Sequence, residues 1–117
     1  MTASGTEMTR RRKSELTPEE ERENALRPDR RLGYDRDQLG GYFMDREAYA
    51  LAESQFRRAS WLNPYEPKFK VHQAWARSRM GDREGALQLL DDVLRDHPNH
   101  AEAAELRRRL VGHPAGS

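Results

Sequence analysis

The sequence contains no cysteine among its 117 residues. It therefore offers no disulfide framework and no thiolate for metal binding or catalysis. Long apolar runs are also missing, because hydrophobic and charged residues each make up 35% of the chain and its mean hydropathy is -1.11. No stretch approaches the roughly 20 apolar residues of a membrane-spanning helix, and the N-terminus lacks the apolar core of a signal sequence. We therefore expect a cytoplasmic protein with a single thin-cored domain.

Recognisable catalytic and cofactor-binding patterns are absent as well. The chain has no glycine-rich phosphate loop and no nucleophile elbow. His97 and His100 lie three apart beside Asp96, but Pro98 interrupts the helical spacing that a metal pair needs, and no further ligand is placed. His72 is interpreted as a surface residue. The sequence therefore predicts no enzyme activity, no cofactor and no metal site.

The sequence does contain an internal repeat at a fixed offset, which we call the repeat period. Its length is 34 residues, as between Pro64 and Pro98 (98 − 64 = 34). Apolar residues three and four apart, followed by a proline, recur at this offset: Ala52, Phe56, Ala59 and Pro64 match Ala86, Leu90, Val93 and Pro98. A period of this size predicts stacked helical hairpins. Such an array is typical of a binding scaffold.

The residues around these anchors resemble the tetratricopeptide repeat family. Residues 81–99, which end in Asp96-His97-Pro98-Asn99, resemble the second helix of one repeat. Leu39-Gly40-x-x-Phe43 is similar to the Leu-Gly-x-x-Tyr of the family's first helix, and Ala52-x-x-x-Phe56 with Pro64 is similar to the motif that ends a repeat. The resemblance covers about residues 33 to 112. It implies an all-α solenoid of antiparallel hairpins, with two repeats and a C-terminal capping helix.

The first helices depart from the family pattern. The family's Trp falls on Arg36 and Lys70, and in the second unit its Leu-Gly pair is Gln73-Ala74 and its Tyr is Arg77. The first helix of that unit is therefore predicted mainly from spacing. Because stacked repeats usually need about three units for stability, we expect a second copy, another partner or the N-terminal segment to cover one end.

Five helices are expected in the repeat region, at about residues 35–44, 46–62, 66–80, 83–96 and 99–111. Gly40 and Gly41 each weaken the first helix by about 1 kcal/mol relative to alanine. Small residues nevertheless allow the paired helix to approach closely. The last helix carries Arg107-Arg108-Arg109 and is interpreted as a polar-faced cap on the stack.

The N-terminal residues form a separate, charged segment. Residues 1–16 hold only scattered apolar side chains, so we expect them to be flexible alone. Thr17-Pro18-Glu19-Glu20 has the pattern of a capped helix start, which predicts a short helix over 18–27 that Pro28 ends. The expected organisation is an arm at 1–32, a helical domain at 33–112 and a disordered tail at 113–117.

The family resemblance also implies where a partner binds, because first-helix side chains line the concave groove of such proteins. Matched by position, the implied groove residues are Tyr34, Asp37, Gly41, Met44 and Asp45 in the first unit and Lys68, Val71, Trp75, Ser78 and Arg79 in the second. The Lys and Asn pattern with which some members clamp a terminal carboxylate is not reproduced. Trp75 either anchors a partner or covers the junction between the hairpins.

Charge is segregated along the repeat region. From Arg57 to Arg79 there are six basic residues and one acidic residue (6 − 1 = +5), whereas from Asp82 to Glu105 there are two basic and seven acidic residues (2 − 7 = −5). Opposite charges at two places favour self-association or an acidic partner. An ordinary solvated helical surface has the same pattern.

These features predict a protein-protein interaction module, either an adaptor or a small scaffold subunit whose arm orders on assembly. The alternative is an accessory protein that contacts RNA or a membrane surface through the basic run Arg10, Arg11, Arg12 and Lys13. The arm up to Leu32 holds eight basic and seven acidic residues, so its net attraction for phosphates is small. It also lacks interleaved aromatic residues for stacking on bases.

Overall fold

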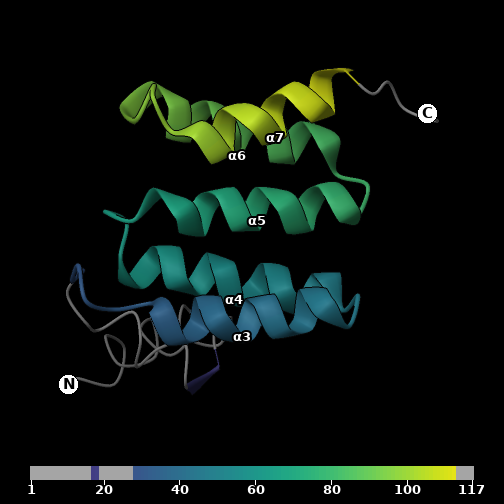
Figure 1. Cartoon of the computed structure of the whole chain (residues 1–117). Helices are drawn as coiled ribbons and strands as arrows, with labels where there is room; N and C mark the ends of the chain where they lie inside the picture. Colours follow the sequence, from purple (N-terminus) through teal and green to yellow (C-terminus); the bar gives the residue numbers. More distant parts are fainter. Residues whose placement is uncertain (1–16, 19–27, 113–117) are drawn as a thin grey trace, which may run out of the picture.

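The computed structural model describes residues 17–18 and 28–112, and within them it contains helices and no strand (Figure 1). The helices are α3 (Tyr34–Asp45), α4 (Tyr49–Leu62), α5 (Pro67–Arg79), α6 (Arg83–Asp96) and α7 (Ala101–Gly112). The predicted all-α fold is confirmed, and the largest difference at a helix end is at α4, which begins at Tyr49 rather than near position 46. The basic run at 10–13, most of the helix expected at 18–27 and the tail at 113–117 lie outside the described residues.

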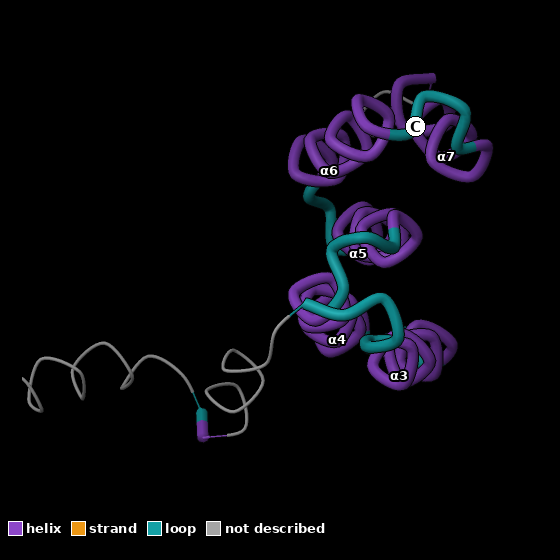
Figure 2. The backbone as a smooth tube through the Cα atoms, turned by 90° about the vertical axis from the view of Figure 1, so that its left-hand side faces the viewer, coloured by secondary structure: helices purple, strands orange, loops and turns teal. Residues whose placement is uncertain are grey.

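The helices form a solenoid-like array in two layers. Each helix packs against the next one along the chain, and α5 also contacts both α3 and α7. Viewed end-on, α4 and α6 lie on one side, while α3 and α7 lie on the other with α5 between them (Figure 2). Helices α3, α5 and α7 therefore share one layer, and this layer carries the candidate site.

Short-range signals in the sequence set the helix ends. Helix α5 begins at Pro67, whose missing N–H costs nothing in the first turn, and the preceding Glu66 side chain accepts a hydrogen bond from the backbone of Lys68 at 3.3 Å. Helix α6 begins after Asp82, which accepts a hydrogen bond from the backbone N–H of Gly85 at 3.0 Å. Because these caps are local, the helix ends could be predicted closely.

The repeat period also holds in three dimensions. Helices α4 and α6 are separated by the same offset at their starts (83 − 49 = 34) and at their ends (96 − 62 = 34). Their matched apolar residues are at most 2% exposed: Ala52, Phe56 and Ala59 in α4, and Ala86, Leu90 and Val93 in α6. Helix α5 contributes to both of the main core clusters, which lie between neighbouring helices. The repeat in the sequence is thus a repeat of buried surface.

Gly40 explains the close contact between α3 and α4. A Cβ atom at this position would lie 2.3 Å from Cε1 of Phe56, which is closer than two non-bonded carbon atoms approach. The prediction of close helix approach is therefore confirmed at Gly40. Gly41 has no such neighbour within 4 Å, so the same explanation does not extend to it.

The chain is attached to the helical domain before α3 begins. The backbone N–H of Asp29 donates to the carbonyl of Leu62 at 3.1 Å. The side-chain amide of Asn63, which is 1% exposed, donates to the carbonyls of Arg30 at 3.0 Å and Leu32 at 3.2 Å. The boundary expected between residues 32 and 33 therefore falls inside a segment that is hydrogen-bonded to the α4–α5 turn.

Candidate partner-binding groove

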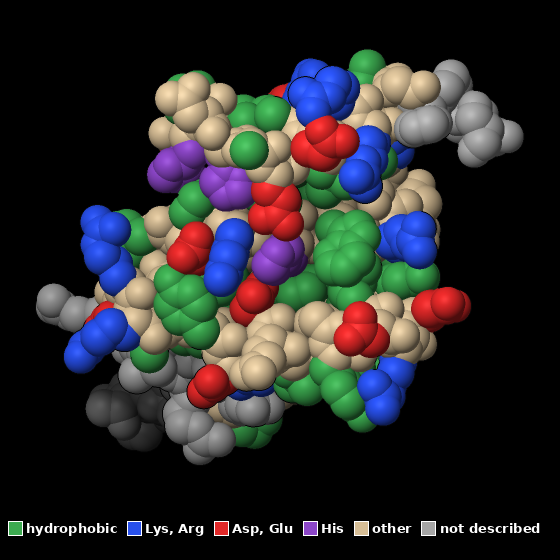
Figure 3. All heavy atoms as spheres, viewed as in Figure 1, with side chains coloured by type: hydrophobic (Ala, Val, Ile, Leu, Met, Phe, Trp, Pro, Cys, Tyr) green, Lys and Arg blue, Asp and Glu red, His purple; other side chains and the backbone are tan. Residues whose placement is uncertain are grey.

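A groove of about 270 Å³ opens between α5 and α7. Its lining combines apolar and charged side chains: Val71, His72, Trp75, Glu102, Glu105, Leu106 and Arg109. Figure 3 looks onto this layer of the molecule and shows hydrophobic side chains among acidic, basic and histidine side chains. The groove is open to solvent along its length and combines an apolar floor with a charged rim, which suits a side chain of a protein partner.

Two of the side chains that the family resemblance implies line the α5 side of this groove. Trp75 is 40% exposed and stands at the groove, whereas Val71 is 1% exposed and belongs to the core beneath it. Val71 thus offers a floor rather than a protruding contact. An indole beside an apolar floor provides large contact area and one hydrogen-bond donor.

The side chains expected from α3 divide between surface and core. The Tyr34 hydroxyl donates to Oε1 of Glu66 at 2.6 Å, and its ring meets the ring of Phe69 edge-on at 5.1 Å between centroids. Met44 is 5% exposed and belongs to the same buried cluster as Phe56. The expectation that Met44 faces a partner therefore does not fit its burial, and its role is to fill the core.

The remaining expected residues do not line the groove. Nζ of Lys68 lies 5.3 Å from the centroid of the Tyr34 ring. The Ser78 hydroxyl donates to the carbonyl of Trp75 in its own helix at 2.7 Å. The guanidinium of Arg79 lies 5.5 Å from the ring centroid of Tyr49. The structure therefore concentrates the site nearer to α7 than the family resemblance implies.

His72 joins all three helices of this layer, and no sequence motif indicates that role. Its Nδ1 lies 2.7 Å from Oδ1 of Asp37 in α3, and its Nε2 lies 3.7 Å from Oε2 of Glu102 in α7. Burial lowers the pKa of His72, but the hydrogen bond to Asp37 and the charges of Asp37 and Glu102 outweigh it, so the pKa lies above its ordinary value despite nearby Lys68. The side chain is 23% exposed, so its interpretation as a simple surface residue is wrong.

Helix α7 forms the second wall of the groove, whereas the sequence predicts it only as a cap. The repeat period, applied to the groove residues of α5, points to this wall. Glu102 matches Lys68 (102 − 68 = 34), and Arg109 matches Trp75 (109 − 75 = 34). Leu106, which packs against the core cluster that contains Val71, then completes the wall. Helix α7 thus lies where the first helix of a third repeat unit is expected.

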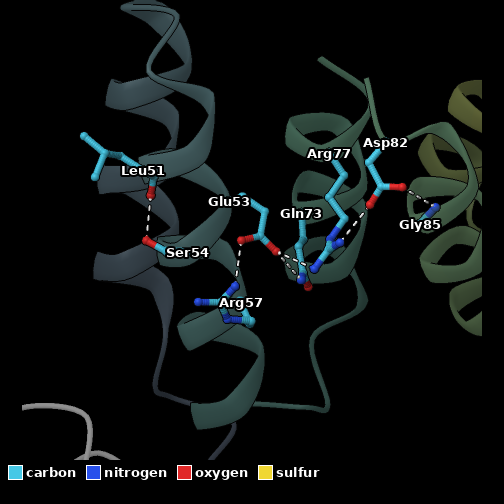
Figure 4. A network of polar contacts seen from close by, with 8 residues as sticks. All are labelled: Leu51, Glu53, Ser54, Arg57, Gln73, Arg77, Asp82 and Gly85. Carbon is cyan, nitrogen blue, oxygen red and sulfur yellow. Dashed lines mark hydrogen bonds and ion pairs between the residues drawn. The ribbon is translucent and has the colours of Figure 1, made fainter. Parts of the chain in front are cut away.

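A buried carboxylate fixes the position of α5 behind the groove (Figure 4). Glu53 of α4 is 4% exposed, and its carboxylate accepts hydrogen bonds from Arg57 at 2.7 Å and from Gln73 at 2.8 Å. It also forms an ion pair with Arg77 at 3.1 Å. Arg77 also pairs with Asp82 at 2.8 Å, directly before α6. The opposite charges that are segregated in the sequence are therefore partly neutralised inside the fold.

Comparison with models of known protein families finds no match, and a search of curated proteins finds no relative. Among residues 17–18 and 28–112, no three metal-ligating side chains of His, Asp or Glu gather into a possible site. None of the helices in these ranges is long and apolar enough to cross a membrane. The inference of function therefore depends on the geometry of the groove.

Proposed function

We propose that the chain is a non-catalytic protein-interaction module of tetratricopeptide repeat type, acting as an adaptor or small scaffold subunit. The partner segment lies in the groove between α5 and α7, where an apolar side chain of the partner packs against Trp75 and Leu106. The observation that carries this proposal is a 40% exposed tryptophan beside an apolar floor, in a groove with a charged rim.

The repeat type is supported by the spacing of helices as well as by motifs. The second helices α4 and α6 follow the repeat period, and so do the starts of α5 and α7, since 101 − 67 = 34. Alternate helices fall into alternate layers, and the layer that carries the groove contains α3, α5 and α7. This arrangement presents one continuous face to a partner.

The rim of the groove supports recognition by polar contacts around the apolar anchor. Glu102 is partly exposed and faces His72, while Arg109 lies 3.3 Å from Glu105. Charged side chains at a rim affect orientation and rate of binding more than affinity. A partner segment with an apolar side chain flanked by charged residues of both signs matches this lining.

The test begins with affinity purification of the full chain and identification of its partner by mass spectrometry. Binding of the purified partner is then measured by calorimetry for the wild type, Trp75→Ala and the control Trp61→Ala. Trp61 is a matched control because it is 45% exposed and does not line the groove. Loss of a central aromatic anchor costs about 2 kcal/mol or more, so we expect Trp75→Ala to weaken binding by about 30-fold and Trp61→Ala to have little effect.

Equal affinity of the wild type and Trp75→Ala would contradict the groove assignment. A greater loss with Trp61→Ala would move the contact to the end of α4. Circular dichroism of each variant provides the folding control, because Trp75 lines the groove together with the core residue Val71.

A further inference from the structure

The two carboxylates that line the groove differ in how they are paired. Glu105 pairs with both Arg108 and Arg109 of its own helix. The side chain of Glu102 is 59% exposed, and its one ion pair among the described residues joins Oε2 to Nε2 of His72 at 3.7 Å. This separation is longer than a hydrogen bond. Glu102 is therefore the carboxylate of the groove that is open to a partner.

The neutral ring of His72 presents a hydrogen-bond acceptor to the same place. Its Nδ1 lies 2.7 Å from Oδ1 of Asp37, and a carboxylate only accepts, so the proton of the neutral ring is on Nδ1. Nε2 then carries a lone pair and faces Oε2 of Glu102. An N–H donor at about 2.9 Å from each of these two acceptors satisfies both. The pair therefore suits a positively charged donor.

We propose that the groove recognises a basic side chain of its protein partner, lysine or arginine, whose cationic group lies between Nε2 of His72 and Oε2 of Glu102. The carboxylate provides opposite charge, and the imidazole provides a second acceptor. The rings of His72 and Trp75 meet edge-on with 6.5 Å between centroids, so the apolar stem of the basic side chain can pack against the indole. This inference rests on the proposed function, because the basic residue belongs to the partner segment that packs against Trp75 and Leu106.

Two basic side chains of the same chain lie near the groove and have other contacts. Nζ of Lys68 lies 5.3 Å from the centroid of the Tyr34 ring, and Lys68 does not line the groove. Arg109 lines the groove but pairs with Glu105 at 3.3 Å. The geometry therefore favours a partner as the source of the charged donor.

The geometry of α7 sets the spacing of the two partner residues. Leu106 follows Glu102 by four positions, which is about 6 Å along the helix axis. In an extended chain, side chains two positions apart lie on one face and are about 6.6 Å apart. A partner segment with an apolar and a basic residue two positions apart therefore reaches Leu106 and Glu102 together.

Protonation of His72 opposes this recognition. The charged groups that act on the ring are Asp37 of α3, Glu102 of α7 and Lys68 of α5, while α4 contributes the uncharged ring of Phe56 at 5.3 Å between centroids. A protonated ring donates toward Glu102 and repels a cation, whereas a neutral ring accepts from it. Because the pKa of His72 lies above its ordinary value, the change occurs near neutral pH. We therefore expect binding to strengthen as the pH rises.

A random peptide library displayed on phage and selected on the full chain tests the partner class. Peptides that bind the wild type but not Trp75→Ala are those that occupy the groove. We expect them to be enriched in lysine or arginine two positions from a large apolar residue. Calorimetry then uses one selected peptide that lacks histidine and acidic residues, so that the peptide itself does not titrate near neutral pH.

The calorimetry compares the wild type with Glu102→Gln and with the control Glu84→Gln. Glu84 is exposed and lies in the first turn of α6 as Glu102 does in α7, but it does not line the groove. We expect Glu102→Gln to weaken binding about tenfold and Glu84→Gln to have no effect. The wild type is expected to bind about fivefold more tightly at a pH of about 8.5 than at about 6, and His72→Gln to lose this dependence.

The outcomes separate this inference from the proposed function. Groove-bound peptides without the basic residue, or equal affinity of the wild type and Glu102→Gln, would overturn the inference and leave the groove assignment in place. A library that yields no peptide dependent on Trp75 would overturn both. Circular dichroism checks that His72→Gln remains folded, and Glu102→Gln tests the same contact at an exposed position.

Discussion

Among the individual residues, His72 marks most clearly where prediction from sequence ends. Its partner Asp37 lies 35 positions away along the chain. A pairing of this kind depends on how α3 stacks on α5, and neither residue forms a recognisable motif with its sequence neighbours. Trp75, in contrast, was identified because an aromatic residue on a first helix is informative by itself.

The bridge at His72 predicts a pH dependence of stability. Because the pKa of His72 in the folded state is raised above its ordinary 6.5, folding favours the protonated ring. The resulting stabilisation is complete below pH of about 6.5 and is lost as the pH rises through the folded-state pKa. We expect Asp37→Asn to lower the free energy of unfolding by about 1–2 kcal/mol at pH 6 and by less at pH 9, as measured by urea titration.

Asp35→Asn is the matched control for this effect, because Asp35 is an exposed carboxylate on the same helix. Glu102 of α7 and Lys68 of α5 also face the ring, so both stay unchanged in the experiment. A pH profile that is the same for the two variants would show that the bridge does not contribute to stability.

Among the helices, the ends were predicted well and the roles less well. Pro67 and Asp82 act on their immediate neighbours, and the repeat period places α6 relative to α4, so the limits of α5 and α6 follow from these signals. The role of α7 did not follow, because its arginines suggested a cap while its position in the period indicated a third groove helix. The burial of Met44 also differs from the expectation, because the family resemblance indicates groove positions and not how the core packs.

The α3–α4 contact gives a prediction with its control built into the sequence. Gly40→Ala places a Cβ 2.3 Å from the Phe56 ring, so we expect a loss of about 1–3 kcal/mol in the free energy of unfolding. Gly41→Ala meets nothing within 4 Å, and we expect a gain of about 0.5–1 kcal/mol because alanine favours the helix. Thermal unfolding followed by circular dichroism measures both. Equal effects of the two substitutions would contradict the close approach at Gly40.

In the molecule as a whole, α5 is the common element of the structure and of the proposed function. It contributes Ala76 to one core and Val71 and Ala74 to the other, and Glu53 fixes it from behind through Gln73. The same helix presents Trp75 and His72 to the groove. A binding surface on a helix held by two cores is preorganised, which lowers the cost of ordering on binding.

Nuclear magnetic resonance of the ¹⁵N-labelled chain can distinguish a partner in the groove from a partner elsewhere, since its only two indole N–H groups belong to Trp61 and Trp75. The titrant is the purified partner identified by affinity capture. If the partner lies in the groove, we expect the Trp75 indole signal to shift or broaden during the titration while the Trp61 signal stays in place. Movement of the Trp61 signal alone, with the Trp75 signal unchanged at saturation, would contradict the assignment of the groove as the binding site.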